Sequence, residues 1–255
     1  RISCHHFHLG PLLPDAASFG LLPENLQGKM CLEIGSGAGQ NSLFLASQGA
    51  ICLATDIAEK QLNEGRRLAA DSGLSDRVSF QVVNMDDLPL KDLASETGYD
   101  LIHSTYALPF ADNPALVIHQ LAGLLKPGGQ LLITTGHPLF AGEWIELDEN
   151  EEGLFLTDYF NPPPEVRFEE LEEGDVFIAS RTVPIGLTVQ WLLDAGLVLE
   201  AFLEPEPLPV PTFSMDEIAR LVPYSSPLWI ELYPQIAKVP VVAVFSARKP
   251  NKFSF

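Results

Sequence analysis

Cys31-Leu32-Glu33-Ile34-Gly35-Ser36-Gly37-Ala38-Gly39-Gln40 is the stretch that decides the fold, and Asp56 closes the apolar run that follows it. Its apolar residues predict a buried strand, its three glycines a tight turn, and its last residue the start of a helix. Glycines permit positive φ angles and let the backbone approach a ligand closely. Asp56 lies 17 residues after the last glycine, where a carboxylate accepts hydrogen bonds from both vicinal hydroxyls of a ribose. The stretch therefore predicts a nucleoside site between two parallel strands.

The spacing of the glycines distinguishes two kinds of nucleotide site. A dinucleotide fingerprint is G-x-G-x-x-G, whereas the glycines here fall as G-x-G-x-G, with Glu33 two residues before the first. A carboxylate at that strand end repels a pyrophosphate and attracts a ligand that carries positive charge. The pattern therefore argues against a dinucleotide such as NAD.

The composition indicates a globular protein and excludes several partners. The chain has 255 residues, 46% apolar and 19% charged, which allows one large α/β domain with a full core. Its formal net charge of -19 argues against nucleic acid, because every phosphate contact requires a local cation. No apolar run approaches the ~18 residues of a membrane span, and no signal peptide is visible. We expect neither a nucleic-acid partner nor a membrane partner.

The three cysteines favour a reducing compartment. Cys4, Cys31 and Cys52 are too few and too badly spaced for a disulfide framework or a zinc site. Cys31 and Cys52 fall in apolar runs that predict core thiols, which fits a cytoplasmic protein. The early histidines have no carboxylate partner at ligand spacing, so we expect no metal.

Strand and helix patterns alternate along most of the chain, which is typical of a parallel sheet covered on both faces. We expect strands over 30–34, 51–55, 78–83, 100–104, 130–135, 197–203 and 239–246. We expect helices over 40–48, 58–70, 114–125, 182–195 and 215–221, and a short one within 15–22.

The alternation breaks over residues 137–175, which are acidic and aromatic, with Pro162-Pro163-Pro164 in the middle. Connections of this length in a compact domain are usually functional or disordered, so we expect an inserted lid with short strands at 154–156 and 176–178. The predicted organisation is a single domain with an N-terminal segment (1–28), a cofactor-binding core (29–136), the lid (137–181) and a completion of the sheet (182–255).

Several motifs together resemble those of the class I S-adenosylmethionine-dependent methyltransferases. They are the glycine turn with Glu33, the acidic loop at 84–86, the fourth strand at 100–104 and the Leu-Lys-Pro-Gly-Gly turn at 125–129. His137-Pro138 and Arg181-Thr182, at the start of the late helix, resemble a bacterial small-molecule subgroup. The resemblance implies an α/β, Rossmann-like, seven-stranded sheet whose last strand is antiparallel. It also implies S-adenosylmethionine as cofactor and a small-molecule acceptor.

The resemblance assigns the cofactor site residue by residue. Glu33 orients the amino-acid end of the cofactor and Asp56 binds the ribose. Met85 and Asp86 contact the adenine, with Asp87 as the alternative acid, and the backbone at Ser104 and Thr105 lies near the methionine portion. The cofactor-binding set is Glu33, Gly35, Ser36, Gly37, Gly39, Asp56, Ile57, Met85, Asp86 and Ser104.

Two residues are candidates for catalysis. His137 follows strand five and has an ordinary pKa near the working pH of a general base, although the His-Pro pair is equally typical of a capped turn. Tyr106 follows strand four, where it either hydrogen-bonds the acceptor or lines the pocket. His103 lies inside strand four and is interpreted as a hydrogen-bonded core histidine.

Substrate contacts are predicted for Tyr159, Arg181 and His8. Arg181 either clamps a substrate carboxylate in bidentate fashion or pairs with an acid of the lid. Tyr159, together with Phe160, Trp144 and Trp191, forms either an acceptor pocket or a small core within the lid. His8 reaches the site if the N-terminal segment folds over it.

Three functions are compatible with these residues. The first is methyl transfer to an oxygen, nitrogen or carbon of a small molecule. The second is cyclisation or cleavage of S-adenosylmethionine itself, because the sulfonium activates more than its methyl group. The third is a non-catalytic cofactor-binding partner protein.

Overall fold

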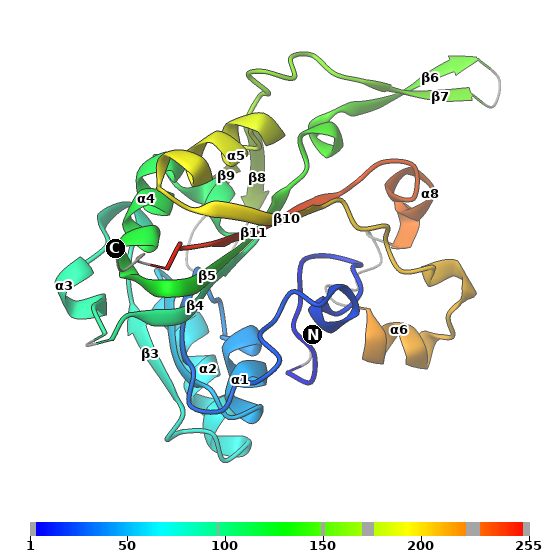
Figure 1. The fold of residues 1–255 in the computed structure, drawn as a ribbon. Helices are drawn as coiled ribbons and strands as arrows, with labels where there is room; N and C mark the ends of the chain where they lie inside the picture. The colour runs from blue at the N-terminus through cyan, green and yellow to red at the C-terminus, as the bar shows by residue number, and fades with distance from the viewer. Residues whose placement is uncertain (1–3, 96, 149–150, 170–175, 223–229, 252–255) are drawn as a thin grey trace.

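Seven strands form one central sheet in the computed structural model, which describes residues 4–95, 97–148, 151–169, 176–222 and 230–251 (Figure 1). The strands are β1 (Met30–Ile34), β2 (Ile51–Asp56), β3 (Val78–Val82), β4 (Tyr99–Thr105), β5 (Leu125–Gly136), β10 (Val198–Leu203) and β11 (Val242–Arg248). Their order is β10-β11-β5-β4-β1-β2-β3. β11 pairs antiparallel with both β10 and β5. The predicted Rossmann-like sheet with an antiparallel last strand is therefore confirmed.

Helices cover both faces of this sheet (Figure 1). On one face lie α1 (Gln40–Ser47) and α2 (Glu59–Asp71), together with the N-terminal segment, α6 (Met215–Leu221) and α8 (Tyr233–Ile236). On the other lie α3 (Leu90–Leu93), α4 (Pro114–Leu124) and α5 (Ile185–Asp194). The apolar residues accordingly form two cores, and β1 contributes to both, because successive side chains point to opposite faces.

The alternation of side chains also decides where polar residues point. Cys31 belongs to the core on the α1 face and Leu32 to the core on the opposite face. Glu33 therefore points toward α1. The register of β1 and β4 aligns Glu33 with His103, so the two side chains lie next to each other on the same face.

The insertion between β5 and α5 contains two small antiparallel sheets. β6 (Glu143–Asp148) pairs with β7 (Glu151–Phe155), and β8 (Glu165–Glu169) pairs with β9 (Val176–Ser180). The predicted short strands overlap β7 and β9, whereas β6 and β8 were not predicted. The β6–β7 hairpin projects from the body of the molecule (Figure 1).

Three predicted boundaries are wrong. The late helix begins at Ile185 because Pro184 occupies its N-cap position, so Arg181 precedes the helix and does not open it. β5 begins at Leu125 because the Lys-Pro-Gly-Gly turn is accommodated as an irregularity in its pairing with β4. The early helix is a single 3-10 turn, Ala16–Phe19, which ends at Gly20 in the left-handed conformation. Among the helices of the described ranges, none combines the length and apolar character needed to cross a membrane.

Candidate functional site

Two adjoining hollows lie at the C-terminal ends of β1, β2 and β4, the edge at which open α/β sheets bind ligands. The smaller hollow, about 270 Å³, is lined by His8, Glu33, Gly35, Ser36, Gly37, Ala38, Gln40, Asn41, Gln61 and Thr105. The larger hollow, about 580 Å³, is lined by Gly35, Gly37, Asp56, Ile57, Val83, Asn84, Met85, Asp86, Thr105, Tyr106, Ala107, Phe110 and Asp112. Gly35, Gly37 and Thr105 line both. The hollows therefore form one cleft with the glycine turn at its middle.

The first two glycines of the turn have different roles. Both have positive φ angles, +68° at Gly35 and +55° at Gly37. A Cβ at Gly35 would lie 2.2 Å from the Cβ of Ala107, whereas a Cβ at Gly37 would meet no atom within 4 Å. Gly35 thus allows two segments to pack, and Gly37 exposes backbone to the cleft.

Replacing Gly35 by alanine is expected to destabilise the protein by at least about 1 kcal/mol more than replacing Gly37 by alanine. Both changes place a side chain at positive φ, but only the first adds overpacking, which typically costs about 1–3 kcal/mol. Urea unfolding of the two variants measures the difference. Equal losses of stability would contradict the assigned close contact with Ala107.

Asp56 lies at the end of β2 and lines the larger hollow. Its Oδ2 accepts a hydrogen bond from the backbone N–H of Gly37 (2.7 Å), and its Oδ1 accepts one from Ala58 (2.8 Å). A carboxylate has about four acceptor sites, so each oxygen retains capacity for one hydroxyl. Asp56 both fixes the glycine turn and presents two acceptors to the cleft.

Glu33 is buried and faces the smaller hollow. Its Oε2 accepts hydrogen bonds from the backbone N–H of Ser42 (3.1 Å) and from the Ser42 hydroxyl (2.5 Å), in the first turn of α1. Burial raises the pKa of Glu33 to about 8, although the hydrogen bonds from Ser42 act in the opposite direction. The second oxygen, Oε1, is directed toward His103 on β4.

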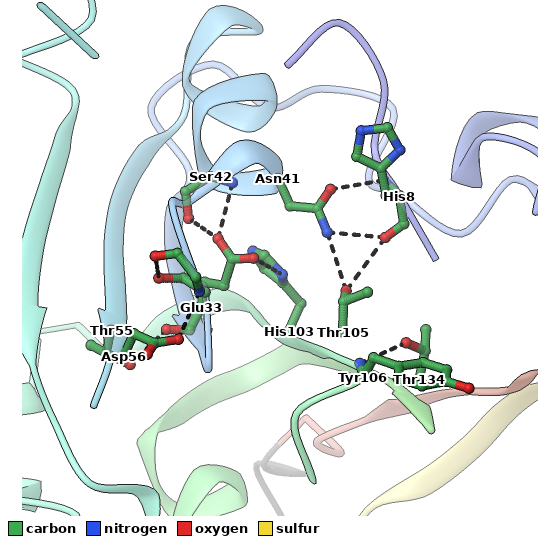
Figure 2. Close-up of polar contacts among 12 residues, drawn as sticks. His8, Glu33, Asn41, Ser42, Thr55, Asp56, His103, Thr105, Tyr106 and Thr134 are labelled. Atoms are coloured by element: carbon green, nitrogen blue, oxygen red, sulfur yellow. Dashed lines mark hydrogen bonds and ion pairs between the residues drawn. The ribbon is translucent and has the colours of Figure 1, made fainter. Parts of the chain in front are cut away.

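His8 brings the N-terminal segment to the site (Figure 2). The Asn41 side chain clamps the backbone of His8: its Oδ1 accepts from the His8 N–H (2.7 Å), and its Nδ2 donates to the His8 carbonyl (3.0 Å). Thr105 Oγ1 is 3.1 Å from the same Nδ2. The preceding residue, Phe7, is fully buried. His8 therefore lines the smaller hollow from outside the sheet.

Met85 and Asp86 lie in a 3-10 turn after β3 and line the larger hollow. Oδ1 of Asp86 accepts a hydrogen bond from the backbone N–H of Asp112 (2.8 Å), which ties two walls of the hollow together. Asp87 is exposed and does not line it. The geometry therefore favours Asp86 over Asp87 as the residue near the adenine.

Ser104 and Gly39 are the two predicted cofactor residues that line neither hollow. Ser104 is buried, whereas its neighbour Thr105 lines the two. Side chains alternate along β4, so only one of the two can face the cleft. Gly39 caps α1 in the left-handed conformation, where a Cβ would lie 2.8 Å from Phe80.

His137 is fully engaged in structural hydrogen bonds. Its Nδ1 accepts from the backbone N–H of Leu139 (3.1 Å), which leaves the hydrogen on Nε2, 2.8 Å from Oε1 of Glu204. Burial lowers the pKa of His137, and Glu204 opposes that shift. His137 caps the turn Pro138–Ala141 and lines neither hollow. The arrangement favours the capping alternative over a general base.

Tyr106 lines the larger hollow and has a strained backbone. Its φ angle is +61°, in a region that residues other than glycine rarely adopt. Its N–H donates to the carbonyl of Thr134 (3.0 Å) on β5. Strain of this kind persists only where the surroundings enforce it and is frequent at functional sites. Tyr106 thus remains the candidate for contact with an acceptor.

The other predicted substrate residues do not gather at the cleft. Arg181 is exposed and lines neither hollow, and its side chain has no ion pair within the described ranges. Tyr159 packs edge-on against Phe160, 5.4 Å between ring centroids, in the insertion. Trp144 lies on β6 under the ammonium group of Lys238, whereas Trp191 packs against the core from α5. None of these four aromatic residues lines either hollow, and a role for them in acceptor binding stays a prediction.

Sequence reasoning missed Asn41, Phe110 and the side chain of Thr105. Phe110 is 46% exposed and lines the larger hollow, so it offers an aromatic face to a planar base. A period of two along β4 would have selected Thr105. Among the described residues, no three His, Cys, Asp or Glu side chains are grouped to hold a metal ion.

The cleft fits the cofactor that the sequence motifs imply. It holds a carboxylate with two available acceptors for a ribose, a second buried carboxyl for a cation, and open space beside the backbone of Gly37. The lining described here includes Asp56, Asp86 and Asp112 and contains no lysine or arginine, so its negative charge disfavours a pyrophosphate. Both features agree with S-adenosylmethionine and not with NAD.

Comparisons with known proteins agree with this chemistry. Residues 32–133 match the family described as Methyltransferase domain. A ubiquinone biosynthesis O-methyltransferase from Bordetella avium is 33% identical over 116 residues, covering 45% of this chain and 45% of that protein. A crystal structure of an S-adenosylmethionine-dependent methyltransferase from Mesorhizobium loti has a TM-score of 0.63 at 20% identity, covering 91% of this chain and 95% of the other.

The same fold is found in a protein of different reactivity. The crystal structure of the cyclase SpnF has a TM-score of 0.57 at 20% identity, covering 88% of this chain and 76% of that one. The chain spans less than half the length of the first curated relatives that it matches.

Proposed function

Because residues 32–133 match the family described as Methyltransferase domain, we propose that this chain transfers a methyl group to an oxygen, nitrogen or carbon of a small molecule. The observation that carries the proposal is the continuous cleft with Glu33 at one end and Asp56 at the other. The two carboxyl groups suit the two polar ends of the cofactor.

Each end of the cleft binds a different part of the cofactor in this proposal. Asp56 accepts the ribose hydroxyls, while Met85, Asp86 and Phe110 enclose the adenine in the larger hollow. Glu33 faces the amino-acid portion in the smaller hollow, where His8 forms the outer wall. When bound, S-adenosylmethionine supplies a methyl group on a sulfonium, which is a good leaving group.

The protein's task is then alignment and exclusion of water. Fixing a nucleophile in line with the reacting methyl group removes much of the entropic barrier. Tyr106, at the wall of the larger hollow, is proposed to hold the acceptor by its hydroxyl. His137 is not assigned a proton transfer, because both of its ring nitrogens are already hydrogen-bonded.

The net charge of the protein and the name of one relative both support a small-molecule acceptor. The net charge is -19, and the cleft lining offers no basic side chain to a phosphate backbone. The related Bordetella avium protein is named for ubiquinone biosynthesis, which is small-molecule chemistry.

Titration calorimetry tests the cofactor and product analysis tests the reaction. We expect saturable binding of S-adenosylmethionine and S-adenosylhomocysteine and no binding of NAD. With a panel of small nucleophiles, turnover should yield S-adenosylhomocysteine. Formation of methylthioadenosine would show attack within the aminopropyl arm and contradict methyl transfer. Binding of NAD in place of the other two would contradict the proposed cofactor.

A further inference from the structure

His103 is a buried histidine without a hydrogen-bond partner. Its side chain is fully buried, and neither ring nitrogen hydrogen-bonds any group of the described residues. The expected hydrogen-bonded core histidine is therefore wrong in this respect. Phe7 packs edge-on against the ring, 5.0 Å between centroids. Leaving a buried polar group unsatisfied costs about 1–3 kcal/mol, so the arrangement requires an explanation.

The ionisable group beside His103 is the carboxyl of Glu33. Nδ1 of His103 lies 3.8 Å from Oε1 of Glu33, too far for a hydrogen bond. Oε2 of Glu33 already accepts two hydrogen bonds from Ser42. Oε1 is thus the oxygen that lies toward His103 and accepts no hydrogen bond from Ser42, and Figure 2 shows the two side chains next to each other under α1.

Few other ionisable groups act on this pair. Asp56 on β2 acts on Glu33 through its negative charge. Cys52, also on β2, lies close to Cys31, and a negative charge on Glu33 would raise the pKa of the Cys52 thiol. His8 faces the same hollow from the N-terminal segment, whereas α1 contributes only the uncharged Ser42.

Burial disfavours the charged form of both members of the pair. It raises the pKa of Glu33 to about 8 and lowers the pKa of His103 to about 3. In the neutral form of Glu33 the proton lies on Oε1, because Oε2 accepts the two hydrogen bonds from Ser42. An arriving cation favours the ionised carboxylate.

We propose that binding of the cofactor's ammonium group displaces the proton of Glu33, and that His103 is a positioning residue whose Nδ1–H then donates to Oε1 of the carboxylate. The O–H bond at Oε1 breaks, its proton leaves to solvent, and His103 stays neutral with its hydrogen on Nδ1. The gap of 3.8 Å closes to about 3 Å in the bound state. This inference rests on the proposed function, because it requires S-adenosylmethionine in the smaller hollow.

Calorimetry in buffers of different ionisation enthalpy measures the protons released on binding. At about pH 7 we expect about one proton released per S-adenosylmethionine bound, and affinity that rises up to about tenfold per pH unit between about pH 6 and pH 7.5. The Glu33→Gln variant should release no proton. Binding by the wild type without proton release would overturn this proposal alone, whereas the absence of binding would overturn the proposed function and this inference with it.

Two substitutions at His103 test the positioning role. His103→Phe fills the space but donates no hydrogen bond. Its affinity for S-adenosylmethionine at about pH 7 should therefore fall at least about tenfold, and the rise of that affinity with pH should move to higher pH. His103→Asn places an N–H near the position of Nδ1 and should restore most of the affinity. Thermal unfolding verifies that both variants are folded. Wild-type affinity and pH profile in folded His103→Phe would overturn the role of His103.

Discussion

Replacing Asp56 by alanine is expected to weaken binding of S-adenosylmethionine at least about 100-fold. Two hydroxyl hydrogen bonds to a carboxylate are lost, and a hydrogen bond to a charged group is worth about 1.5–3 kcal/mol. The substitution also releases the backbone N–H of Gly37, which Oδ2 of Asp56 holds at 2.7 Å. Titration calorimetry with the wild type and the variant measures the loss.

Two controls separate recognition of the ribose from loss of the turn. Asp87→Ala removes one negative charge from the same edge of the sheet, but Asp87 is exposed and outside the cleft lining, so binding should change less than about threefold. An S-adenosylhomocysteine analogue without the ribose 2′-hydroxyl should bind the wild type more weakly than S-adenosylhomocysteine does. The Asp56→Ala variant should bind the analogue and S-adenosylhomocysteine with equal affinity. A persistent preference of Asp56→Ala for S-adenosylhomocysteine would show that Asp56 does not read the hydroxyls.

The cofactor end of the site was predictable because its determinants are local. The residues from Cys31 to Gln40 are contiguous, and Asp56 ends the next strand, paired directly with β1 in the sheet. A strand, a turn and a helix in succession leave little freedom for the ligand position. The first two strand ends and the glycine turn followed from this pattern, whereas the antiparallel last strand followed from the family resemblance.

The outer wall of the cleft depends on contacts between distant segments. His8 is 33 residues from Asn41 and 97 from Thr105, and burial of Phe7 anchors the segment that carries it. No periodicity specifies such a contact. His137 shows the same limit, because its partner Glu204 is 67 residues away, and that contact favours the cap over the base.

The insertion was harder to predict because its first strand, β6, lacks a buried face. β6 is exposed or partly exposed along its whole length and rich in acidic residues, so it has no alternation of apolar and polar residues. Its pairing with β7 provides hydrogen bonds to backbone groups and does not form a core. The sequence therefore predicts the existence of the insertion better than its structure.

The stability of the ligand-free wild type is expected to fall between about pH 6.5 and pH 8. Replacing Glu33 by glutamine is expected to abolish that fall. The pKa of Glu33 is raised from 4.5 to about 8, so the native carboxyl keeps a proton that the unfolded chain has lost. Stability therefore decreases as pH rises through this window, by up to about 1.4 kcal/mol per pH unit. Glutamine is uncharged and of similar shape, so the variant should lack this slope.

His103 determines the lowest pH at which the effect of Glu33 on stability can be measured alone. Its pKa is lowered from 6.5 to about 3, so below pH 6.5 the unfolded chain binds a proton that the native protein does not, and stability falls as pH decreases. Between about pH 4.5 and pH 6.5 the slopes from Glu33 and His103 oppose each other. Above pH 6.5 only the fall in stability that Glu33 causes remains, so measurements above this pH are the informative ones.

Urea unfolding at steps of pH measures the slope in the wild type, in Glu33→Gln and in Glu24→Gln. Glu24 is an exposed glutamate, so its replacement removes the same charge without changing a buried group and should retain the wild-type slope. Wild-type stability that is constant from about pH 6.5 to pH 8 would show that Glu33 is ionised in the free protein. Binding of a cation would then not release its proton, so this measurement on the free protein also bears on the coupling proposed for His103.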